Sequence, residues 1–543
     1  MKLTDFVCEE NARVFLPPDK KWKAIKDFAY LDGAESYLLT TLKNANDLSD
    51  YSEELQLKIK DWPTQYHFGQ GRSNILRALG IGGKLKVLEL GSGCGALSRY
   101  LGETCETVDC VEGSYIRAKI GRERCRDLNM LRVFCSNIID STFEPTYDIV
   151  TLIGVWEYAP AYIKAPGHQA CKRLLELANS ALKDDGTLII AIENKIGLKY
   201  WCGSPDDHTD RIYDGIHGYP GKRPAKKSAV TFSKNEIGKY LRGIGLEYIH
   251  FYHCFPDYKF ASTIFSDLGN DDELYLHNWI DVPFNHPGAV REYIIHEGLA
   301  LRTLSRAGLL REFANSFLVV ASKSNTSVLL KPDWIAKKIS GFPRRRRYRC
   351  ITTLKNAEEL CIEKENLHTE PENARLSATS NAQQLSHRVM KSAWYPGDLL
   401  LFDAYEAIFS NDIKTELTEL LKRYYEELIS RFHTGKNDKD GYPLLRGDCF
   451  DFILKNIVKK DKELVFIDTE WSVLKELPGD YLLYRCLKHD IIKTQCPRMK
   501  ALMRKHRKFT IPIIKAFFPQ YSKKRYNQNS KLDRMLLGAV CKS

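Results

Sequence analysis

The sequence lacks several features that would assign it to a familiar class. It has no run of about 18 consecutive apolar residues, and its first residues, MKLTDFVCEENARVF, contain no apolar core of a signal peptide. None of the 15 cysteines stands in a C-x-x-C pair, and Cys110 and Cys135 fall on predicted strands. Reduced, buried thiols in a cytoplasmic protein are the simplest account of this pattern. We therefore expect neither membrane spans nor a disulfide framework.

The chain is too long for one hydrophobic core. With 543 residues, of which 43% are hydrophobic and 11% aromatic, it is expected to form two or three domains. The formal net charge is +12. Residues 491–543 hold fourteen Lys or Arg and one acid, Asp533, so the remainder of the chain is nearly neutral.

The most informative stretch is Val87 to Gly95, which reads VLELGSGCG. A buried strand that runs into a glycine-rich turn and then a helix is typical of a nucleotide-binding cradle. The glycines let the chain turn tightly and leave main-chain N–H groups open to a ligand. Their spacing is G-x-G-x-G, which differs from the G-x-G-x-x-G of dinucleotide enzymes. A purely structural strand-to-helix turn is the alternative.

Two acidic residues accompany this turn. Glu89 stands just before it, and a second predicted strand, Thr107 to Val111, ends in Glu112. A carboxylate at the end of the second strand can accept both hydroxyl groups of a ribose in doubly wound nucleotide folds. The pair therefore favours an adenosine ligand over a pyrophosphate.

The sequence around the turn alternates between predicted strands and helices. After Glu112 we predict a helix to Arg126, strands at 132–137, 147–153 and 187–192, a helix at 169–182 followed by a turn at 183–186, and a last strand at 317–321. Such alternation predicts an α/β fold with a mostly parallel sheet covered by helices. The ligand is then expected beyond the carboxyl ends of the strands, where the polar residues lie.

The chain resembles class I S-adenosylmethionine-dependent methyltransferases of a branch found with bacterial surface-polysaccharide genes. The segments that carry this resemblance are DWPTQYHFGQGRSNILRAL (61–79), VLELGSGCGALSRYLGE (87–103), IGVWEYAP (153–160) and AIENKIGLKYWCGSPDDHTDRIYDGIHGYPG (191–221), with further likeness at 231–241, 255–267 and 311–323. The resemblance implies a Rossmann-like domain over residues 1–325, with its core at 60–200 and 311–323 and an insertion at 201–310.

The resemblance also implies which residues bind S-adenosylmethionine. They are Glu89, Gly91, Ser92, Gly93, Gly95, Glu112, Asn137 and Ile138. In this scheme the glycines surround the methionine end, Glu112 binds the ribose, and the last two residues flank the adenine. Asn137 stands where an aspartate is usual. Tyr66, His67 and Arg72 are expected either to close over the cofactor or to serve helix packing.

Methyl transfer from an activated sulfonium depends mainly on positioning. A hydroxyl acceptor also needs a general base within hydrogen-bond reach, whereas a phosphate or carboxylate acceptor does not. The best candidates for this catalytic role are His208, Asp207 and Glu193. A loop closed by Asx turns around a structural histidine is the alternative.

The C-terminal half carries a fainter pattern. Asp451 and Asn456 stand in DFILKN, and Asp468 follows a predicted strand in FIDTEW. Phosphotransferases orient an acceptor with such a first aspartate and hold Mg²⁺ with the other two residues. Lys364 is placed upstream to reach nucleotide phosphates. Residues 326–490 thus resemble the two-lobed α+β fold of protein kinases and aminoglycoside phosphotransferases, which implies ATP and Mg²⁺ as ligands, with Asp451 as the catalytic residue and Asn456 and Asp468 on the metal.

This second resemblance has two departures. No glycine-rich loop precedes Lys364, and Cys449 replaces the histidine that usually stands two residues before the catalytic aspartate. A kinase-like module without phosphoryl transfer, or an unrelated α+β domain in which Asp451 and Asp468 cap strands, is the alternative. Bifunctional kinase-methyltransferases that cap bacterial O-antigen chains have the same order of domains.

The basic tail at 491–543 interleaves basic and apolar residues, as in MKALMRKHRKFTIPIIKAFFPQYSKKRY at 499–526. This pattern fits an amphipathic helix on an anionic membrane, where each basic residue near the surface adds about 1 kcal/mol. It fits equally a helix packed on the kinase-like lobe. Nucleic acid is the weakest of the three partners because no nucleic-acid motif is recognised.

Together these features predict a cytoplasmic methyltransferase that acts on a hydroxyl or phosphate of a sugar or glycan, in surface-polysaccharide assembly near the inner membrane. A scaffold that binds ligands without catalysis is one alternative. Methylation of a small metabolite or of nucleic acid is another. No feature of the sequence predicts the accepting atom or the oligomeric state.

Overall fold

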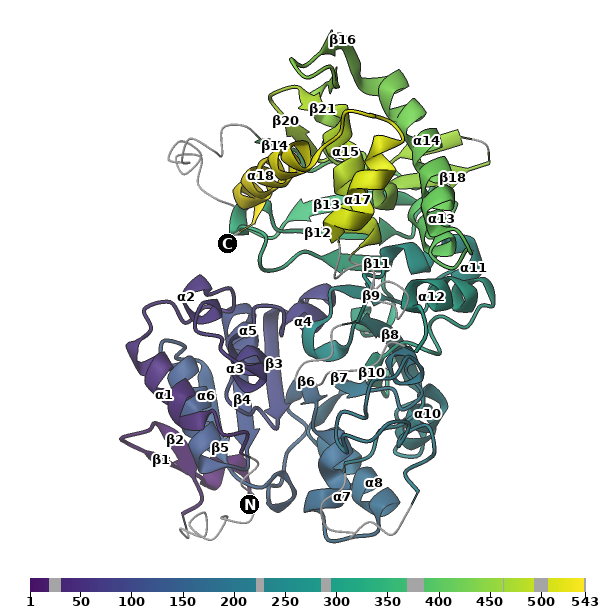
Figure 1. Ribbon diagram of the computed structural model, residues 1–543. Helices are drawn as coiled ribbons and strands as arrows, with labels where there is room; N and C mark the ends of the chain where they lie inside the picture. The colour runs from purple at the N-terminus through teal and green to yellow at the C-terminus, as the bar shows by residue number, and fades with distance from the viewer. Residues whose placement is uncertain are drawn as a thin grey trace. The chain divides into compact units, whose positions relative to one another are not determined.

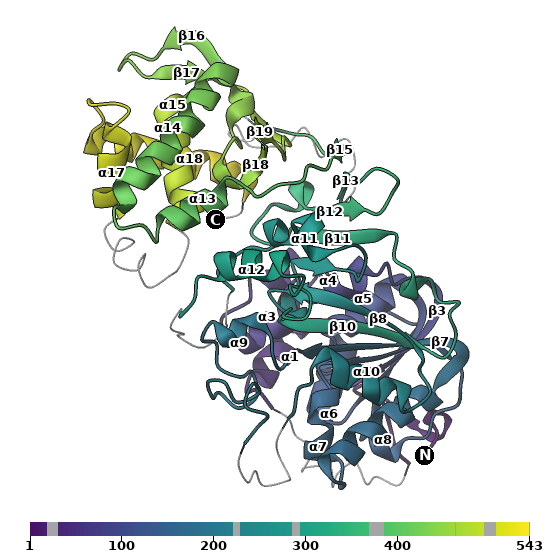
Figure 2. The same cartoon turned by 90° about the vertical axis from the view of Figure 1, so that its right-hand side faces the viewer.

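The computed structural model describes residues 1–18, 31–220, 229–284, 294–368, 385–461, 463–492 and 506–541. They form two compact units (Figures 1 and 2). The first contains Met1–Asp267 and Arg311–Ile335. The second contains Leu268–Phe284, the described residues up to Leu310, and the chain from Ala336 onward.

The first unit is built on a sheet whose central strands run parallel. Its strand order is β1-β2-β5-β4-β3-β6-β7-β10-β8-β9. The pairings from β2 through β7 are parallel, whereas β10 is antiparallel to both β7 and β8. The strands are Val7–Glu9 (β1), Val14–Leu16 (β2), Gly83–Leu90 (β3), Cys105–Glu112 (β4), Leu131–Cys135 (β5), Tyr147–Ile153 (β6), Leu182–Glu193 (β7), Tyr248–Phe255 (β8), Thr263–Phe265 (β9) and Ser316–Ser322 (β10).

Helices pack on this sheet. Figure 1 shows α1, α5 and α6 gathered beside β3, β4 and β5, and α8 lies against β6 and β7. The helices of this unit are Glu35–Asn44 (α1), Glu53–Gln56 (α2), Trp62–Phe68 (α3), Asn74–Ala78 (α4), Ala96–Thr104 (α5), Tyr115–Arg124 (α6), Ala159–Tyr162 (α7), Gly167–Ser180 (α8), Leu198–Trp201 (α9) and Lys234–Arg242 (α10). The predicted α/β fold with a mostly parallel sheet is confirmed.

One local prediction is wrong. The turn expected at 183–186 lies inside β7, because Leu182 pairs with Tyr147 and pairing resumes at Thr187 with Ile149. The strand therefore continues through an irregularity in its register.

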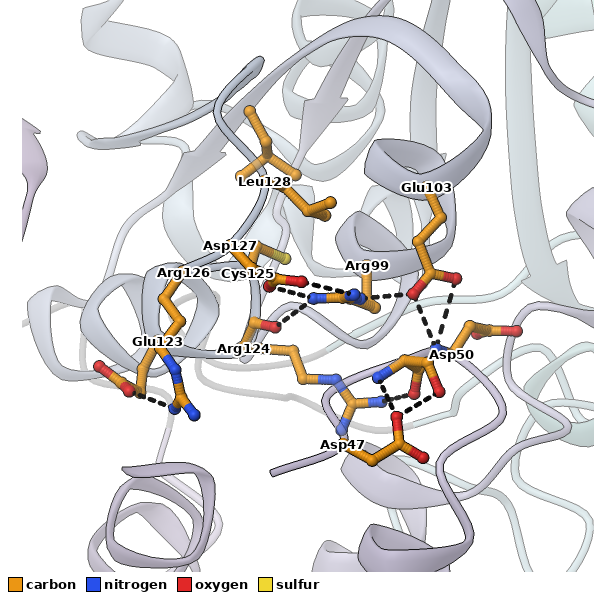
Figure 3. A network of polar contacts seen from close by, with 12 residues as sticks. Asp47, Asp50, Arg99, Glu103, Glu123, Arg124, Cys125, Arg126, Asp127 and Leu128 are labelled. Carbon is orange, nitrogen blue, oxygen red and sulfur yellow. Dashed lines mark hydrogen bonds and ion pairs between the residues drawn. The ribbon is translucent and has the colours of Figure 1, made fainter. Parts of the chain in front are cut away.

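A buried arginine ties together the two helices that follow β3 and β4 (Figure 3). Arg99 on α5 forms ion pairs with Glu103 at 2.6 Å and with Asp127, beyond the end of α6, at 2.5 Å, and it donates to the carbonyl of Arg124 at 3.2 Å. Glu103 also accepts the backbone N–H of Asp50. Because the guanidinium is mostly buried, these partners hold α5, α6 and the loop at Asp50 in one arrangement.

The domain boundaries differ from those predicted. Strands β8 and β9 come from the expected insertion at 201–310, yet they belong to the main sheet. The rest of that segment groups with the second unit, which begins again at Ala336 rather than at residue 326. A buried polar contact explains the grouping, since His277 Nε2 lies 3.0 Å from Asp398 Oδ1. Arg306 binds the other oxygen of Asp398 at 2.6 Å.

The second unit mixes short antiparallel sheets with helices. Its strands are Cys350–Lys355 (β12), Cys361–Asn366 (β13), Leu385–His387 (β14), Ser392–Ala393 (β15), His433–Asn437 (β16), Pro443–Leu445 (β17), Ile457–Lys460 (β18), Glu463–Phe466 (β19), Trp471–Val473 (β20) and Leu477–Pro478 (β21). Strand β11 (Trp334–Ile339) spans the boundary between the units. The helices are Asp271–Leu274 (α11), Glu297–Arg306 (α12), Leu401–Ala407 (α13), Ile413–Phe432 (α14), Gly479–Arg485 (α15) with a π-helical turn at Cys486–Ile491, His506–Lys515 (α17) and Lys523–Val540 (α18).

The described part of the basic tail is integral to the second unit. Phe509, Ile513 and Ile514 of α17 and Leu536 of α18 are buried in its hydrophobic core. These apolar side chains are therefore not free to enter a membrane, and the packed-helix alternative accounts for them. Residues 493–505 of the predicted tail lie outside the described residues, and contact with an anionic membrane stays a prediction.

Two general expectations can be compared with the described residues. None of their helices combines the length and hydropathy that crossing a membrane requires. Their cysteines are free thiols, most of them buried, as the absence of C-x-x-C pairs predicts.

Candidate active site

A cavity of about 490 Å³ lies in the first unit, at the carboxyl ends of the parallel strands. Residues that follow β3, β4, β5 and β6 all line it, because parallel strands bring their carboxyl ends to one edge of the sheet. Among the predicted cofactor-binding residues, those on its wall are Glu89, Gly91, Ser92, Gly93, Glu112, Asn137 and Ile138.

The glycine-rich turn needs its glycines for different reasons. Gly91 has φ +78°, and a Cβ there would stand 2.5 Å from Val155 Cγ2. Gly93 has φ +57°, and its N–H donates to Glu112 Oε2 at 2.8 Å. Gly95 lies between two residues that line the cavity, Cys94 and Ala96, but is not itself among the lining residues. It precedes α5 at φ +81°, and a Cβ there would lie 2.8 Å from Gly121 Cα.

Glu112 is held in place on the cavity wall. Its Oε1 accepts the N–H of Ser114 at 2.8 Å, while Oε2 accepts that of Gly93. Asn137 caps the following turn, where its Oδ1 accepts the N–H of Ile139 at 3.4 Å. The wall thus offers a carboxylate between two strand ends and a main-chain turn without side chains, which fits the ribose and methionine parts of S-adenosylmethionine.

Tyr66, His67 and Arg72 also line the cavity. The guanidinium of Arg72 lies 4.1 Å from the centre of the Tyr66 ring and donates to the carbonyl of Lys259 at 2.9 Å. His67 Nε2 lies 2.9 Å from Asp32 Oδ2. These residues line the cavity and are fixed there by contacts with their neighbours, while closure over the cofactor stays a prediction.

The structure brings the predicted catalytic residues together. His208 lines the cavity, and its Nε2 lies 3.4 Å from Glu193 Oε2. Asp207 lies 3.1 Å from the ammonium of Lys259, which also contacts Glu193. Glu193 is fully buried and is not among the lining residues, and it contacts the lining residues His208 and Lys259.

Burial and charge set the protonation of this cluster. Burial opposes a charged His208, but the charge and hydrogen bond of Glu193 outweigh it and raise the His208 pKa to about 9. Burial also opposes a charged Glu193, but Lys259 and His208 bring its pKa to about 2. At neutral pH His208 therefore carries its proton, so the predicted general base must first lose that proton before it can accept another.

Several cavity residues were missed from the sequence. Glu157 follows β6 in IGVWEYAP, and Lys259 stands in FPDYKFASTIF, two segments of the noted resemblance. Each is a charged residue between two aromatic ones, a signal that is visible but not specific. Asp206, by contrast, accepts the N–H groups of His208 and Thr209 as the Asx-turn alternative predicts.

The predicted phosphotransferase residues meet in the second unit. Lys364 on β13 contacts Asp468 and lies 2.7 Å from Glu470, a residue that the sequence analysis missed. Asn456 donates to the carbonyl of Asp451 at 3.0 Å. The carboxylate of Asp451 lies 3.1 Å from the guanidinium of Arg485, so in the structure it forms an ion pair with that residue.

Glu89 provides a test of the cavity's electrostatics. Burial raises its pKa from 4.5 to about 7, even though Ser98 and the Cys110 thiol donate to it. The unfolded chain therefore loses this proton first, so the stability that protonated Glu89 contributes is complete below about pH 4.5 and is lost as the pH rises through about 7.

As the pH rises from about 4 to about 8, the wild type loses the stability that protonated Glu89 provides, whereas Glu89→Gln does not. We therefore expect the free energy of unfolding of Glu89→Gln to increase by roughly 3 kcal/mol relative to that of the wild type over this range. Urea unfolding across a pH series, without added cofactor, measures this difference. Glu106→Gln, at an exposed position on β4, controls for the chemical change itself. A difference between Glu89→Gln and the wild type that stays constant over the pH range would contradict the assignment.

Comparisons with known proteins point to the same class. Residues 88–190 match the family model described as a methyltransferase domain. No curated protein matches the chain. Matched solved structures include a SAM-dependent methyltransferase from Thermotoga maritima, with 16% identity over 48% of this chain and 91% of that one and a TM-score of 0.28. Another is the magnesium protoporphyrin IX methyltransferase from Synechocystis with bound SAH. It has 14% identity over 55% of this chain and 99% of that chain, and a TM-score of 0.29. The match of residues 88–190 to a methyltransferase domain agrees with the geometry of the cradle, which fits S-adenosylmethionine.

Proposed function

We propose that this protein transfers a methyl group from S-adenosylmethionine to an oxygen of a sugar, a glycan or a sugar phosphate in surface-polysaccharide assembly. The observation that carries this proposal is the composition of the cavity. One part of its wall is the glycine-rich cradle with Glu112, and another combines aromatic rings with the charged side chains of His208 and Lys259.

In this proposal, different residues of the cavity have different roles. Gly91, Gly93 and Glu112 would hold the cofactor, which supplies a methyl group already activated by its sulfonium. Tyr66 and Arg72 wall the cavity and limit the access of water. Because transfer to an activated methyl depends on alignment, the rigid packing of these side chains is the main contribution of the protein.

The acceptor is inferred from the rest of the wall. Trp62, Tyr66 and Tyr162 present aromatic surface, which suits the apolar faces of a sugar ring. Lys259 and His208 carry donors that suit a hydroxyl or phosphate oxygen. Asp207 and Glu193 position these two donors through the contacts described above. The sequence resemblance at 191–221 supports the same acceptor class.

Cofactor binding tests the cradle. We expect calorimetric titration with S-adenosylmethionine to show saturable binding by the wild type and none by Gly93→Arg, whose side chain would fill the cradle beside Arg117. Glu112→Gln keeps the shape but loses the charge, so its affinity should fall about tenfold or more. Gly341→Arg, at an open position of the second unit, is the matched control and should bind like the wild type. Equal binding by Gly93→Arg would contradict the assignment of this turn as the cofactor site.

Transfer of labelled methyl groups tests the acceptor. With S-adenosylmethionine labelled in the methyl group, we expect the wild type, and not Gly93→Arg, to label mono- and oligosaccharides or their phosphates. Mass spectrometry of the product would assign the methyl to oxygen. If nucleic acid or a small amine is labelled and sugars are not, the proposed sugar acceptor is wrong and the labelled molecule is the acceptor instead. Cofactor binding without turnover on any of these acceptors would favour the scaffold alternative.

A second function is proposed for the second unit, namely binding of ATP with Mg²⁺ in a kinase-like site. The contact of Lys364 with Asp468 favours it, because nucleotide phosphates and Mg²⁺ need a lysine and a carboxylate at one place. Burial raises the pKa of the Asp451 carboxyl against the opposing charge of Arg485, and the charge of Asp468 adds to the rise. Strands β18 and β19 separate the two aspartates in the sequence as a hairpin.

We expect Mg²⁺-ATP to raise the unfolding temperature of the wild type and to bind at least about tenfold more weakly to Asp468→Asn, which loses the charge that faces Mg²⁺. Differential scanning fluorimetry with Mg²⁺-ATP, compared with Mg²⁺ alone, measures the effect. Asp440→Asn, in the same unit, is the control. No stabilisation of the wild type by Mg²⁺-ATP would leave the second unit without a nucleotide role.

A further inference from the structure

The wall of the methyltransferase cavity contains a carboxylate with an unusual environment. Glu157 is fully buried, and neither of its oxygens has a hydrogen-bond partner. Protonation would not relieve this, because a neutral carboxyl group would bury an unpaired O–H donor as well as an unpaired carbonyl. Buried polar groups without partners are rare in proteins and call for an explanation.

Two further ligand groups face Glu157. One oxygen or nitrogen each of Glu157, Glu193 and His208 lies within 4.8 Å of the others. The Nε2 of His208 and the Oε2 of Glu193 are 3.4 Å apart. Two ligands of a tetrahedral site with bonds of about 2.1 Å are themselves about 3.4 Å apart. The three groups come from the ends of two parallel strands and from the turn after α9, so separate elements hold them.

The acidic groups of the buried cluster outnumber its basic ones. The cluster contains Glu157, Glu193, Asp206, Asp207 and Asp257 against Lys199, Lys259 and His208. Lys199 lies 2.7 Å from Asp207, and Lys259 contacts the oxygen of Glu193 that does not face His208. Burial and the charge of Glu193 raise the pKa of Glu157 to about 8, so a bound cation would displace a proton from Glu157 and from His208.

We propose that Glu157, Glu193 and His208 bind one divalent transition-metal cation at the wall of the cavity. One imidazole nitrogen with two carboxylates suits Mn²⁺ or Zn²⁺ better than Mg²⁺, which prefers oxygen ligands alone. Glu157 and His208 are among the residues that line the cavity, so the proposed ion would lie at its wall, beside a bound acceptor. There it would hold and polarise an acceptor oxygen, a role that rests on the proposed function, whereas the binding itself does not.

The experiment measures binding of Mn²⁺ alone to the full-length protein after treatment with a chelator. Electron paramagnetic resonance reports free Mn²⁺ directly, and competition with Zn²⁺ ranks the two ions. We expect one saturable site in the wild type and a loss of affinity of about tenfold or more in Glu157→Gln and in His208→Ala. Glu176→Gln, on the exposed side of α8, should bind Mn²⁺ like the wild type.

One control keeps this test separate from the methyltransferase proposal. Binding of S-adenosylmethionine by Glu157→Gln, measured by calorimetry, shows that the variant is folded. If the wild type binds Mn²⁺ through Glu157 but binds no S-adenosylmethionine, the metal site stands and the proposed function fails. Absence of saturable Mn²⁺ and Zn²⁺ binding, or binding that Glu157→Gln leaves unchanged, would overturn the metal site alone.

Discussion

The cradle depends on how closely two backbones approach each other. A Cβ on Gly95 would stand 2.8 Å from Gly121 Cα, and one on Gly121 would stand 3.4 Å from the carbonyl oxygen of Gly93. Only glycine at these positions lets the start of α5 lie against α6 at this distance. The approach brings the N–H of Gly93 to Glu112, and the buried ion pairs of Arg99 hold the two helices there. The position of the Glu112 carboxylate is thus a consequence of helix packing.

The second constraint is electrostatic. Carboxylates and cations buried at the strand ends are tolerable only when they are paired, because an isolated buried charge is very costly. Lys259 satisfies Asp207 and Glu193 together, and Lys199 adds a second pairing to Asp207. This network fixes His208 and Lys259 at the cavity wall before any substrate arrives. Within the described residues neither lysine forms an ion pair with Glu157, so that carboxyl group lies outside this network.

The sequence predicts those parts of the fold and site that depend on local pattern. Strand-helix alternation and the VLELGSGCG turn predict the parallel sheet, the cradle and Glu112, because each depends on residues a few positions apart. Gly121, Glu157 and Lys259 were missed because their roles arise from contacts with distant segments, and single residues carry no periodic signal. The unit boundary was misplaced for the same reason. The pairing of His277 with Asp398 joins residues far apart in the sequence.

The basic tail shows that one sequence pattern is compatible with two different structures. Alternating apolar and basic residues suit a helix on a membrane and a helix on a protein core equally well. Ile513 and Ile514 are buried in the core of the second unit. Asp533 is the only acidic residue of the tail, and it is fully buried and forms ion pairs with Lys488 and His489. Any attraction of residues 506–541 to an anionic surface must then come from their exposed basic side chains without insertion of these apolar groups. Such attraction is about 1 kcal/mol per basic residue near the surface and weakens as salt screens it.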